Sequence, residues 1–166
     1  MEFRVRAQRD DGFTLIEASV SLVLAVILFS VLGTLLMASV RQSRETRGQA
    51  AATELSVEGI EVTRALPWDE LAMVDTQTGD TRISGGMLLA SAVDLPSNET
   101  LIIDGTDGSV QSKYTVTIDL LDYDVYQYVT EVQPGLRRAM VVVTWDAGPS
   151  LRSHHTSALI SEARAG

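Results

Sequence analysis

A stretch of 23 residues without a charged side chain, from Ala18 to Val40, constrains this chain more than any other feature. An α-helix of that length is about 35 Å long, and a bilayer's hydrocarbon core is about 30 Å thick. A core helix of a soluble protein rarely stays apolar on every face over so many residues. The stretch therefore predicts one membrane-spanning helix near the N-terminus.

The charges around this stretch bear on its orientation. It is preceded by Arg4, Arg6 and Arg9 and followed by Arg41, Arg44 and Arg47. Because arginines flank both ends, the charge bias that orients membrane helices is nearly balanced. We expect the N-terminus in the cytoplasm, since the chain beyond the span is long enough to form a folded, acidic exterior domain.

A secretory signal peptide is the alternative interpretation of the apolar stretch. Such signals have a shorter apolar region, of about 7–15 residues, followed by a small-x-small cleavage site. Near the end of this stretch, Leu36-Met37-Ala38 lacks the first of the two small residues. Both observations favour a span that is kept.

Composition excludes several classes of function. The net charge of −9 disfavours nucleic acid as a partner, because phosphate binding needs a basic surface. The chain has no cysteine, which excludes disulfides, thiolate catalysis and cysteine-based zinc sites. No nucleophile elbow, P-loop or dinucleotide-binding glycine motif occurs. We therefore expect neither an enzyme nor a bound cofactor, and the length of 166 residues favours one domain.

Glu17 does not fit a plain membrane anchor. It lies at the start of the apolar run and follows the uncharged residues Gly12-Phe13-Thr14-Leu15-Ile16. A carboxylate among lipid-facing residues is costly, so it usually has a partner or a function. The simpler alternative is that Glu17 lies among the lipid headgroups, where a charge costs little.

The six residues from Gly12 to Glu17 follow a short polar leader with arginines and precede a long apolar helix. They resemble the cleavage and methylation signature of type IV prepilins and type II secretion pseudopilins. The close resemblance covers roughly residues 1–45. Beyond it, Arg64-Ala65-Leu66-Pro67-Trp68-Asp69 and the residues around 141–145 look like the PilV-like minor pilins.

The resemblance implies a role for each of three residues. A membrane-embedded prepilin peptidase would cut between Gly12 and Phe13 and methylate the new amino group of Phe13. Glu17 would be the acidic residue needed for efficient methylation and assembly. Glycine lets an extended backbone enter a protease cleft without a side-chain clash. The new amine could pair with Glu17 of a neighbouring subunit, so that two charges compensate each other where burial is costly.

One departure from the family concerns the middle of the span. Many major pilins carry a helix-kinking proline there, whereas this chain has Gly33 and Thr34. Glycine weakens a helix by about 1 kcal/mol relative to alanine, which is less than proline does. Gly33 therefore allows the helix to bend during assembly but does not impose a bend.

The helix is expected to continue beyond the membrane, from about residue 14 to residue 65. Ala52, Leu55, Gly59, Val62 and Leu66 recur at spacings of three and four, which predicts one packed face. The polar side carries Arg47, Glu54, Glu58 and Glu61, and Pro67 is expected to end the helix. The predicted organisation is a leader at 1–12, a membrane and filament-core helix at 13–40, its continuation at 41–66, and a connecting region with a sheet at 67–166.

The remaining residues predict an antiparallel sheet. Turn signals at 76–80 and 84–86 mark residues 67–98 as a connecting region, with short strands expected around 87–93 and 101–103. Tyr114, Val116, Ile118 and Leu120 alternate with polar residues, as in a strand. Further strands are expected at 139–145 and 156–160, with separators at 122–135 and 146–149. We expect an α+β domain of the type IV pilin-like fold, in which three to five strands pack against the long helix.

The candidates for metal binding are weak. Asp104 and Asp107 lie in an Asp/Gly-rich segment whose composition is similar to that of a calcium-binding loop. The spacing and the terminal Glu of an EF-hand are missing. A plain turn is favoured, and no metal is expected. His154 and His155 are adjacent, so on a strand they would point to opposite faces and not share a metal. Both are expected at the surface.

The leading hypothesis is a minor pilin of a type IV pilus. The alternatives in the same class are a minor pseudopilin of a type II secretion system and a DNA-uptake competence pseudopilin, and a membrane-anchored ligand-binding module is a different class. The expected partners are prepilin peptidase, other pilin or pseudopilin subunits, the inner-membrane assembly platform and the lipid bilayer. The expected location is the bacterial inner membrane, as a single-pass protein, and then an extracytoplasmic or cell-surface filament.

Overall fold

A long helix dominates the first third of the computed structural model, which describes residues 14–148 and 150–164. Helix α1 (Leu15–Arg64) passes through two compact units, which divide between Arg44 and Glu45. Thr14 precedes its first turn, and its hydroxyl accepts a hydrogen bond from the backbone N–H of Glu17 at 3.3 Å, as an N-cap does. The predicted helix from 14 to 65 is therefore confirmed to within one residue at each end.

The part of α1 in the first unit packs against nothing in the described chain. From Leu15 to Val40 its side chains are exposed, apart from the half-buried Ala25. The exposed fraction is 86% for Leu15 and 74% for Phe29. By length and composition this is one helix able to cross a membrane.

The part of α1 in the second unit packs on the sheet through one face. This face consists of Gly48, Ala52, Leu55, Ser56, Gly59, Ile60 and Thr63. The predicted face was partly wrong, because Val62 is 59% exposed. At 3.6 residues per turn, Val62 is rotated by about 100° from Thr63 and so leaves the face that Thr63 occupies. The predicted polar side at Arg47 and the three glutamates is exposed.

Four long strands form an antiparallel meander in chain order. They are β4 (Lys113–Ile118), β5 (Leu121–Gln133), β6 (Leu136–Asp146) and β7 (Leu151–Ser161). The last two extend the strands predicted at 139–145 and 156–160. The expectation that residues 122–135 separate strands was wrong, since β5 is the longest strand of the sheet. Its tyrosines and aspartates suggest a turn in isolation, but they find partners on both sides of the sheet.

Three short strands extend the sheet. They are β1 (Ile83–Ser84), β2 (Met87–Leu88) and β3 (Glu99–Leu101), and β3 pairs with the end of β5 that β4 leaves open. The sheet thus has seven strands instead of the predicted three to five, because elements of two or three residues give little sequence signal. The strand predicted at 87–93 was half wrong, as its second part is helix α2 (Ala90–Val93). A 3-10 turn (Glu162–Arg164) follows β7.

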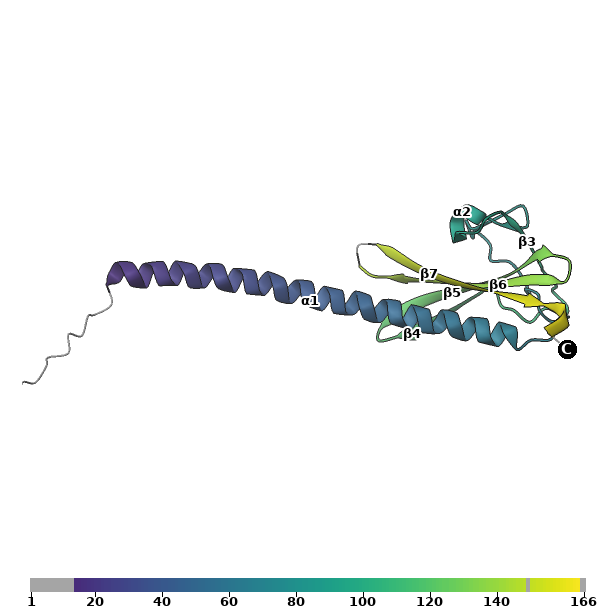
Figure 1. The fold of residues 1–166 in the computed structure, drawn as a ribbon, viewed down its shortest axis with the longest axis horizontal. Helices are drawn as coiled ribbons and strands as arrows, with labels where there is room; N and C mark the ends of the chain where they lie inside the picture. The colour runs from purple at the N-terminus through teal and green to yellow at the C-terminus, as the bar shows by residue number, and fades with distance from the viewer. Residues whose placement is uncertain (1–13, 149, 165–166) are drawn as a thin grey trace, which may run out of the picture. The chain divides into compact units, whose positions relative to one another are not determined.

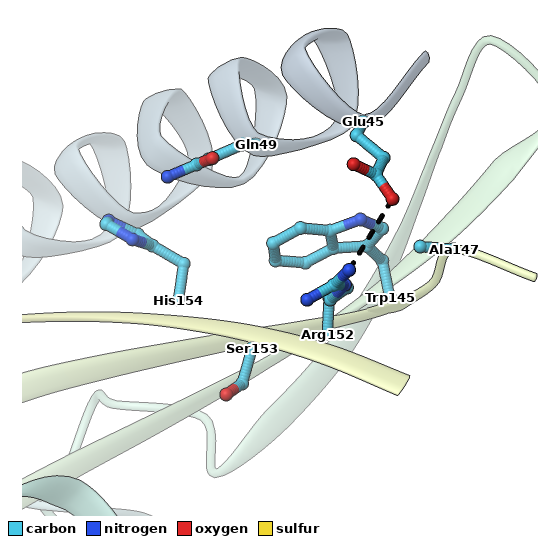
Figure 2. Close-up of a pocket in the computed structure, with 7 residues that line it drawn as sticks. All are labelled: Glu45, Gln49, Trp145, Ala147, Arg152, Ser153 and His154. Carbon is cyan, nitrogen blue, oxygen red and sulfur yellow. Dashed lines mark hydrogen bonds and ion pairs between the residues drawn. The ribbon is translucent and has the colours of Figure 1, made fainter. Parts of the chain in front are cut away.

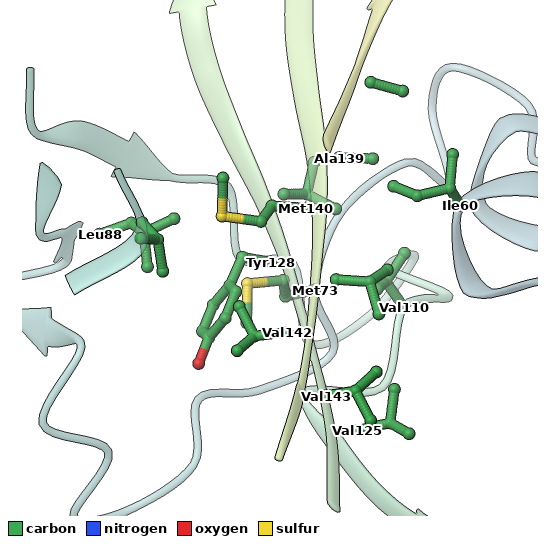
Figure 3. Close-up of a cluster of buried hydrophobic side chains, with 14 of the residues drawn as sticks. Ile60, Met73, Leu88, Val110, Val125, Tyr128, Ala139, Met140, Val142 and Val143 are labelled. Atoms are coloured by element: carbon green, nitrogen blue, oxygen red, sulfur yellow. The ribbon is translucent and has the colours of Figure 1, made fainter. Parts of the chain in front are cut away.

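The hydrophobic core lies on both faces of the sheet. Figure 3 shows Ile60 of α1 on one side and Leu88 of β2 on the other. Val125 and Val143 are fully buried near the helix side, and Met140 lies towards Leu88. Because β5 and β6 are covered on both faces, their sequences lack a simple alternation of apolar and polar residues.

The β4–β5 turn differs from the predicted strand. Leu120 was expected in the alternating pattern, but it lies in the two-residue turn with Asp119 and is 97% exposed. Both residues have positive φ angles, 50° for Asp119 and 64° for Leu120. Two positive φ angles are typical of the tight hairpin turn that matches the twist of the strands. The β4–β5 and β6–β7 turns lie at the same end of the sheet (Figure 1).

Candidate functional site: the apolar helix and the adjoining end of the sheet

The predicted processing site lies at the border of the described structure. Gly12 and Phe13 are outside the described residues, and α1 begins at Leu15. Glu17 occupies the first turn of α1 and is exposed. A carboxylate at this end of a helix interacts favourably with the helix dipole. The polar group that the sequence singled out is therefore placed on a regular helix and accessible to a partner.

Most of the large hydrophobic side chains that are exposed in residues 14–148 and 150–164 lie on α1 after Glu17, between Val20 and Val40. Between Val20 and Val40, eight leucine, isoleucine and phenylalanine side chains are all more than half exposed, among them Leu22, Ile27 and Phe29. A contiguous apolar surface of this kind marks a site of contact with a membrane or with other proteins. The apolar surface of the first unit is therefore a candidate site for such a contact.

The second unit has a polar pocket at the end of the sheet where its part of α1 begins. The pocket has a volume of about 250 Å³ and is lined by Glu45, Gln49, Trp145, Ala147, Arg152, Ser153 and His154. Figure 2 shows Glu45 reaching from α1 to Arg152 of β7, and the two charged groups are 3.5 Å apart. Both side chains are more than half exposed, so this ion pair adds little to stability.

Trp145 forms the floor between α1 and the sheet at this pocket. A Cβ built on Gly48 would come 3.0 Å from Nε1 of Trp145, so only glycine fits there without a shift. The indole also lies 6.0 Å from the ring of Tyr123, centroid to centroid. These contacts hold the start of this part of α1 against β6.

His154 and His155 occupy opposite faces of β7, as predicted. His155 is exposed, but His154 is half-buried and lines the pocket, which corrects the expectation that both lie at the surface. Nε2 of His154 is buried and has no hydrogen-bond partner among the described residues. Burial lowers the pKa of His154 below its ordinary value, and the nearby His155 lowers it further.

A second polar pocket, of about 370 Å³, lies over the loop before β1 and the start of β4. The Arg82 guanidinium stands 4.0 Å above the ring of Tyr126 and donates hydrogen bonds to Asp80 and to the hydroxyl of Tyr128. The Tyr128 hydroxyl in turn donates to Asp80. Burial, and then the bond to Asp80, raise the pKa of Tyr128. Since these groups satisfy one another, they fasten the loop to the sheet.

The Asp104 segment forms a turn that uses its own carboxylate. Oδ1 of Asp104 accepts hydrogen bonds from the backbone N–H groups of Thr106 at 3.0 Å and Asp107 at 3.2 Å. These two bonds lower the pKa of Asp104. Within residues 14–148 and 150–164, no group of three or more histidine, aspartate or glutamate side chains is placed to hold a metal ion. The calcium-loop alternative therefore gains no support from Asp104 and Asp107.

The segment after α1 is fastened by a residue that sequence reasoning missed. Arg137 of β6 donates hydrogen bonds to the backbone carbonyls of Trp68 at 2.6 Å and Leu71 at 2.9 Å. Its guanidinium also lies 4.2 Å from the centroid of the Trp68 ring. No local signal in the sequence connects positions so far apart, although an aromatic residue just after the helix end could have suggested a packing role.

Comparison of the chain with protein-family models, with curated proteins and with solved structures finds no match.

Proposed function

We propose that this chain is a minor pilin: a structural subunit that prepilin peptidase processes and that assembles through α1 into a type IV pilus-like filament. One observation carries the proposal. The motif from Gly12 to Glu17 extends into the first turn of a 50-residue helix, whose first part is exposed and apolar and whose second part packs on an antiparallel sheet. The same α+β layout is what the resemblance to pilins implies.

The exposed part of α1 would have the same apolar surface covered in two successive environments. In the membrane, lipid tails would cover the apolar side chains from Ala18 to Val40 as a single span. In a filament, the same side chains would be covered by α1 of neighbouring subunits. The apolar surface is needed in both states, which is why it carries no polar face. The N-terminus would lie in the cytoplasm and the second unit outside.

Glu17 supports a specific contact in the filament. After cleavage, Phe13 would carry a positively charged amine, and Glu17 of a neighbouring subunit would lie among apolar side chains. A pair between the two compensates charges that are costly to bury singly. Since Glu17 lies in the first helical turn and is exposed, it is available for that pairing.

The mass of the N-terminus tests the proposal. The protein should be recovered from membranes of cells with an active prepilin peptidase, and from matched cells in which that peptidase is deleted. We expect a chain that begins at Phe13 and is one methyl group heavier in the first case, and a chain that begins at Met1 in the second. A chain that begins at Met1 in both would overturn the proposal and leave a plain membrane anchor.

A second measurement separates the pilus from the secretion system. In a strain that lacks this chain, surface filaments and the secreted proteins should be compared with those of the parent strain. Loss of filaments with normal secretion supports a minor pilin. Normal filaments with loss of secretion would contradict the pilus assignment and favour a minor pseudopilin.

A further inference from the structure

Strand β7 forms one edge of the sheet, and among the described residues its outer side has no strand partner. All of its residues pair with β6 on the inner side, from Leu151 opposite Asp146 to Ser161 opposite Leu136. The outward N–H and C=O groups of such a strand are free to pair with another chain. Proteins often protect a free edge with a proline, a lysine or a bulge, and β7 has none of these. The strand is therefore open to the addition of a further strand.

Strand β4 forms the opposite edge of the sheet beside the first half of β5. Its six residues pair with β5 and with no other described strand, from Lys113 opposite Tyr126 to Ile118 opposite Leu121. Its one charged side chain, Lys113, is bound to Asp124 of β5 at 2.8 Å. The second unit thus has two free edges, one on each side of the four-strand meander.

The order of the strands decides how these two edges can meet. Each strand from β4 to β7 runs antiparallel to the next, so β4 and β7 run in opposite directions. A second copy in the same orientation therefore presents its β4 antiparallel to β7, and antiparallel ladders are the slightly more stable type. This contact joins two different surfaces of the chain. It can therefore repeat from copy to copy and build an open helical assembly.

On the face of the sheet that α1 covers, both edges are apolar. Ala158 and Ile160 of β7 are buried on this face. The strand register places Tyr114, Val116 and Ile118 of β4 on the same face, where they are only half-buried. A copy that continues the sheet in the same orientation keeps this face on the same side. The pairing would therefore extend the apolar layer and cover the exposed parts of the β4 side chains.

On the opposite face, both edges present small hydroxyl side chains. Ser153 and Ser157 of β7 are exposed, and so are Thr115 and Thr117 of β4. Pairs of threonine and serine across two strands stabilise a ladder. Neither edge strand contains a carboxylate, although the chain has 22 aspartates and glutamates and a net charge of −9. The pairing therefore brings no carboxylate of one edge strand against a carboxylate of the other.

We propose that β7 of one copy of this chain pairs antiparallel with β4 of a second copy, so that the sheets of successive copies join edge to edge. The inference rests on the proposed function in one respect: subunits of a filament follow one another in a single orientation. It adds to that function a contact between the second units, which is made by main-chain hydrogen bonds.

The absence of cysteine makes a direct test by disulfide cross-linking practicable. One version of the full chain carries Thr115→Cys, and the other carries Ser153→Cys, His155→Cys or Ser157→Cys. All four positions are exposed on the same face of the sheet, and the three on β7 cover registers that differ by two residues. The control replaces the β7 cysteine by Val62→Cys, an exposed position on α1. The two versions carry tags of different length and are co-expressed in cells with an active prepilin peptidase.

Oxidation of the membranes and filaments should cross-link Thr115→Cys to one of the β7 cysteines several-fold more than to the control. Cysteines that lie directly opposite each other on paired strands are close enough for a disulfide. The β7 position that cross-links best is then combined with Thr115→Cys in one chain. Because the contact is between unlike edges, this chain should form a ladder of products beyond the dimer.

Three results would overturn the inference. Cross-linking among β7 cysteines alone, which stops at the dimer, would indicate a twofold β7–β7 contact. Cross-linking of β7 to a protein of another size would show that a different subunit covers this edge. The third result is cross-linking no greater than in the control. The N-terminal mass from the same membranes then separates two cases: a chain that begins at Phe13 leaves the minor-pilin proposal standing, and a chain that begins at Met1 contradicts both.

Discussion

Gly59 of α1 lies directly against Val141 of β6: a Cβ built on Gly59 would come 3.1 Å from Cγ2 of Val141. The same Cβ would come 3.1 Å from Nε2 of Gln127 on β5. Both distances are shorter than ordinary van der Waals contacts. The helix therefore approaches the sheet at this point about as closely as its backbone permits, and a side chain at position 59 would have to displace it.

Replacing Gly59 by leucine is expected to destabilise the second unit. Overpacking of a tight core contact typically costs about 1–3 kcal/mol. The measurement is chemical unfolding of the full chain in detergent, followed by near-ultraviolet circular dichroism of the tryptophans and tyrosines. Val57→Leu on the exposed side of the same helix is the control, with an expected change within about 0.5 kcal/mol. Equal losses for the two variants would show that α1 does not approach the sheet at Gly59.

Replacing Arg82 by methionine should be strongly destabilising. Its partner Asp80 has a side chain that is only 2% exposed, and the substitution removes the cation beside it. Removing one partner of a buried ion pair typically costs about 3–5 kcal/mol, because the remaining charge stays buried. Arg64→Met removes a comparable pair with Glu61 at the surface, where the expected loss is about 0–1 kcal/mol. If unfolding midpoints of the two variants coincide, Asp80 is solvated and the buried pair is not formed.

His154 is expected to make the second unit less stable in mild acid. Because burial lowers its pKa below the ordinary value of 6.5, the unfolded chain takes up the proton before the folded chain does. Stability therefore falls as the pH decreases through 6.5 towards the folded-state pKa. Glu45, Arg152 and His155 are the charged or titratable groups near this imidazole.

The check is to measure the unfolding midpoint at about pH 7.5 and about pH 5.5, which bracket the histidine titration. His154→Gln should remove most of the decrease seen in the parent chain. His155→Gln is the matched control on the exposed face of β7, and it should retain most of that decrease. A decrease of the same size in the parent chain and in His154→Gln would assign the pH dependence to other groups.

Leu120→Asn is expected to stabilise the second unit by about 1 kcal/mol, since asparagine adopts the left-handed conformation at lower cost. The side chain of Leu120 is almost fully exposed, so its removal loses no packing. Leu120→Ala also keeps a Cβ but lacks the short polar side chain whose local hydrogen bonds favour the left-handed conformation in asparagine, so it should leave stability nearly unchanged. Thermal unfolding in detergent distinguishes the variants, and a gain for alanine equal to that for asparagine would contradict the backbone explanation.

Glu17→Gln should separate processing from assembly. The substitution keeps the size of the side chain but removes the charge that is proposed to pair with the amine of Phe13. Assembled filaments should decrease by about a hundredfold, which corresponds to the lower end of the cost of breaking a buried pair. Cleavage after Gly12 should continue. Glu61→Gln on the exposed side of α1 is the control and should assemble normally.

The bounds of α1 were predictable because their signals are local. A run of apolar residues begins just after Thr14, and Pro67 prevents helical geometry in the residue before it. The buried face was less predictable. Val62 fits the spacing of an apolar stripe, but Ile60 and Thr63 are the residues that contact the sheet. The spacing of apolar residues locates the packed face of a helix only approximately around its axis. Contacts with the sheet determine which side is buried.

The sheet was predictable where one face is exposed and not where both are covered. Residues 122–133 resemble a separator because they combine aspartates with tyrosines. In β5, Asp124 instead accepts hydrogen bonds from Lys113 at 2.8 Å and Thr115 at 2.7 Å across the ladder. Because of these bonds between paired strands, the sheet accommodates an aspartate, a residue type that locally favours loops.

The sequence by itself determined the long uncharged helix, the motif before it and the α+β layout, since each depends on residues near one another in the chain. Only the tertiary structure decided that His154 is half-buried while His155 is exposed, that Arg137 holds the segment after α1, and that Leu120 and Leu151 lie at the same end of the sheet. These relationships join residues that are distant in the chain. They arise from strand pairing and from the burial of one helix face, and neither can be inferred from the conformational preferences of neighbouring residues.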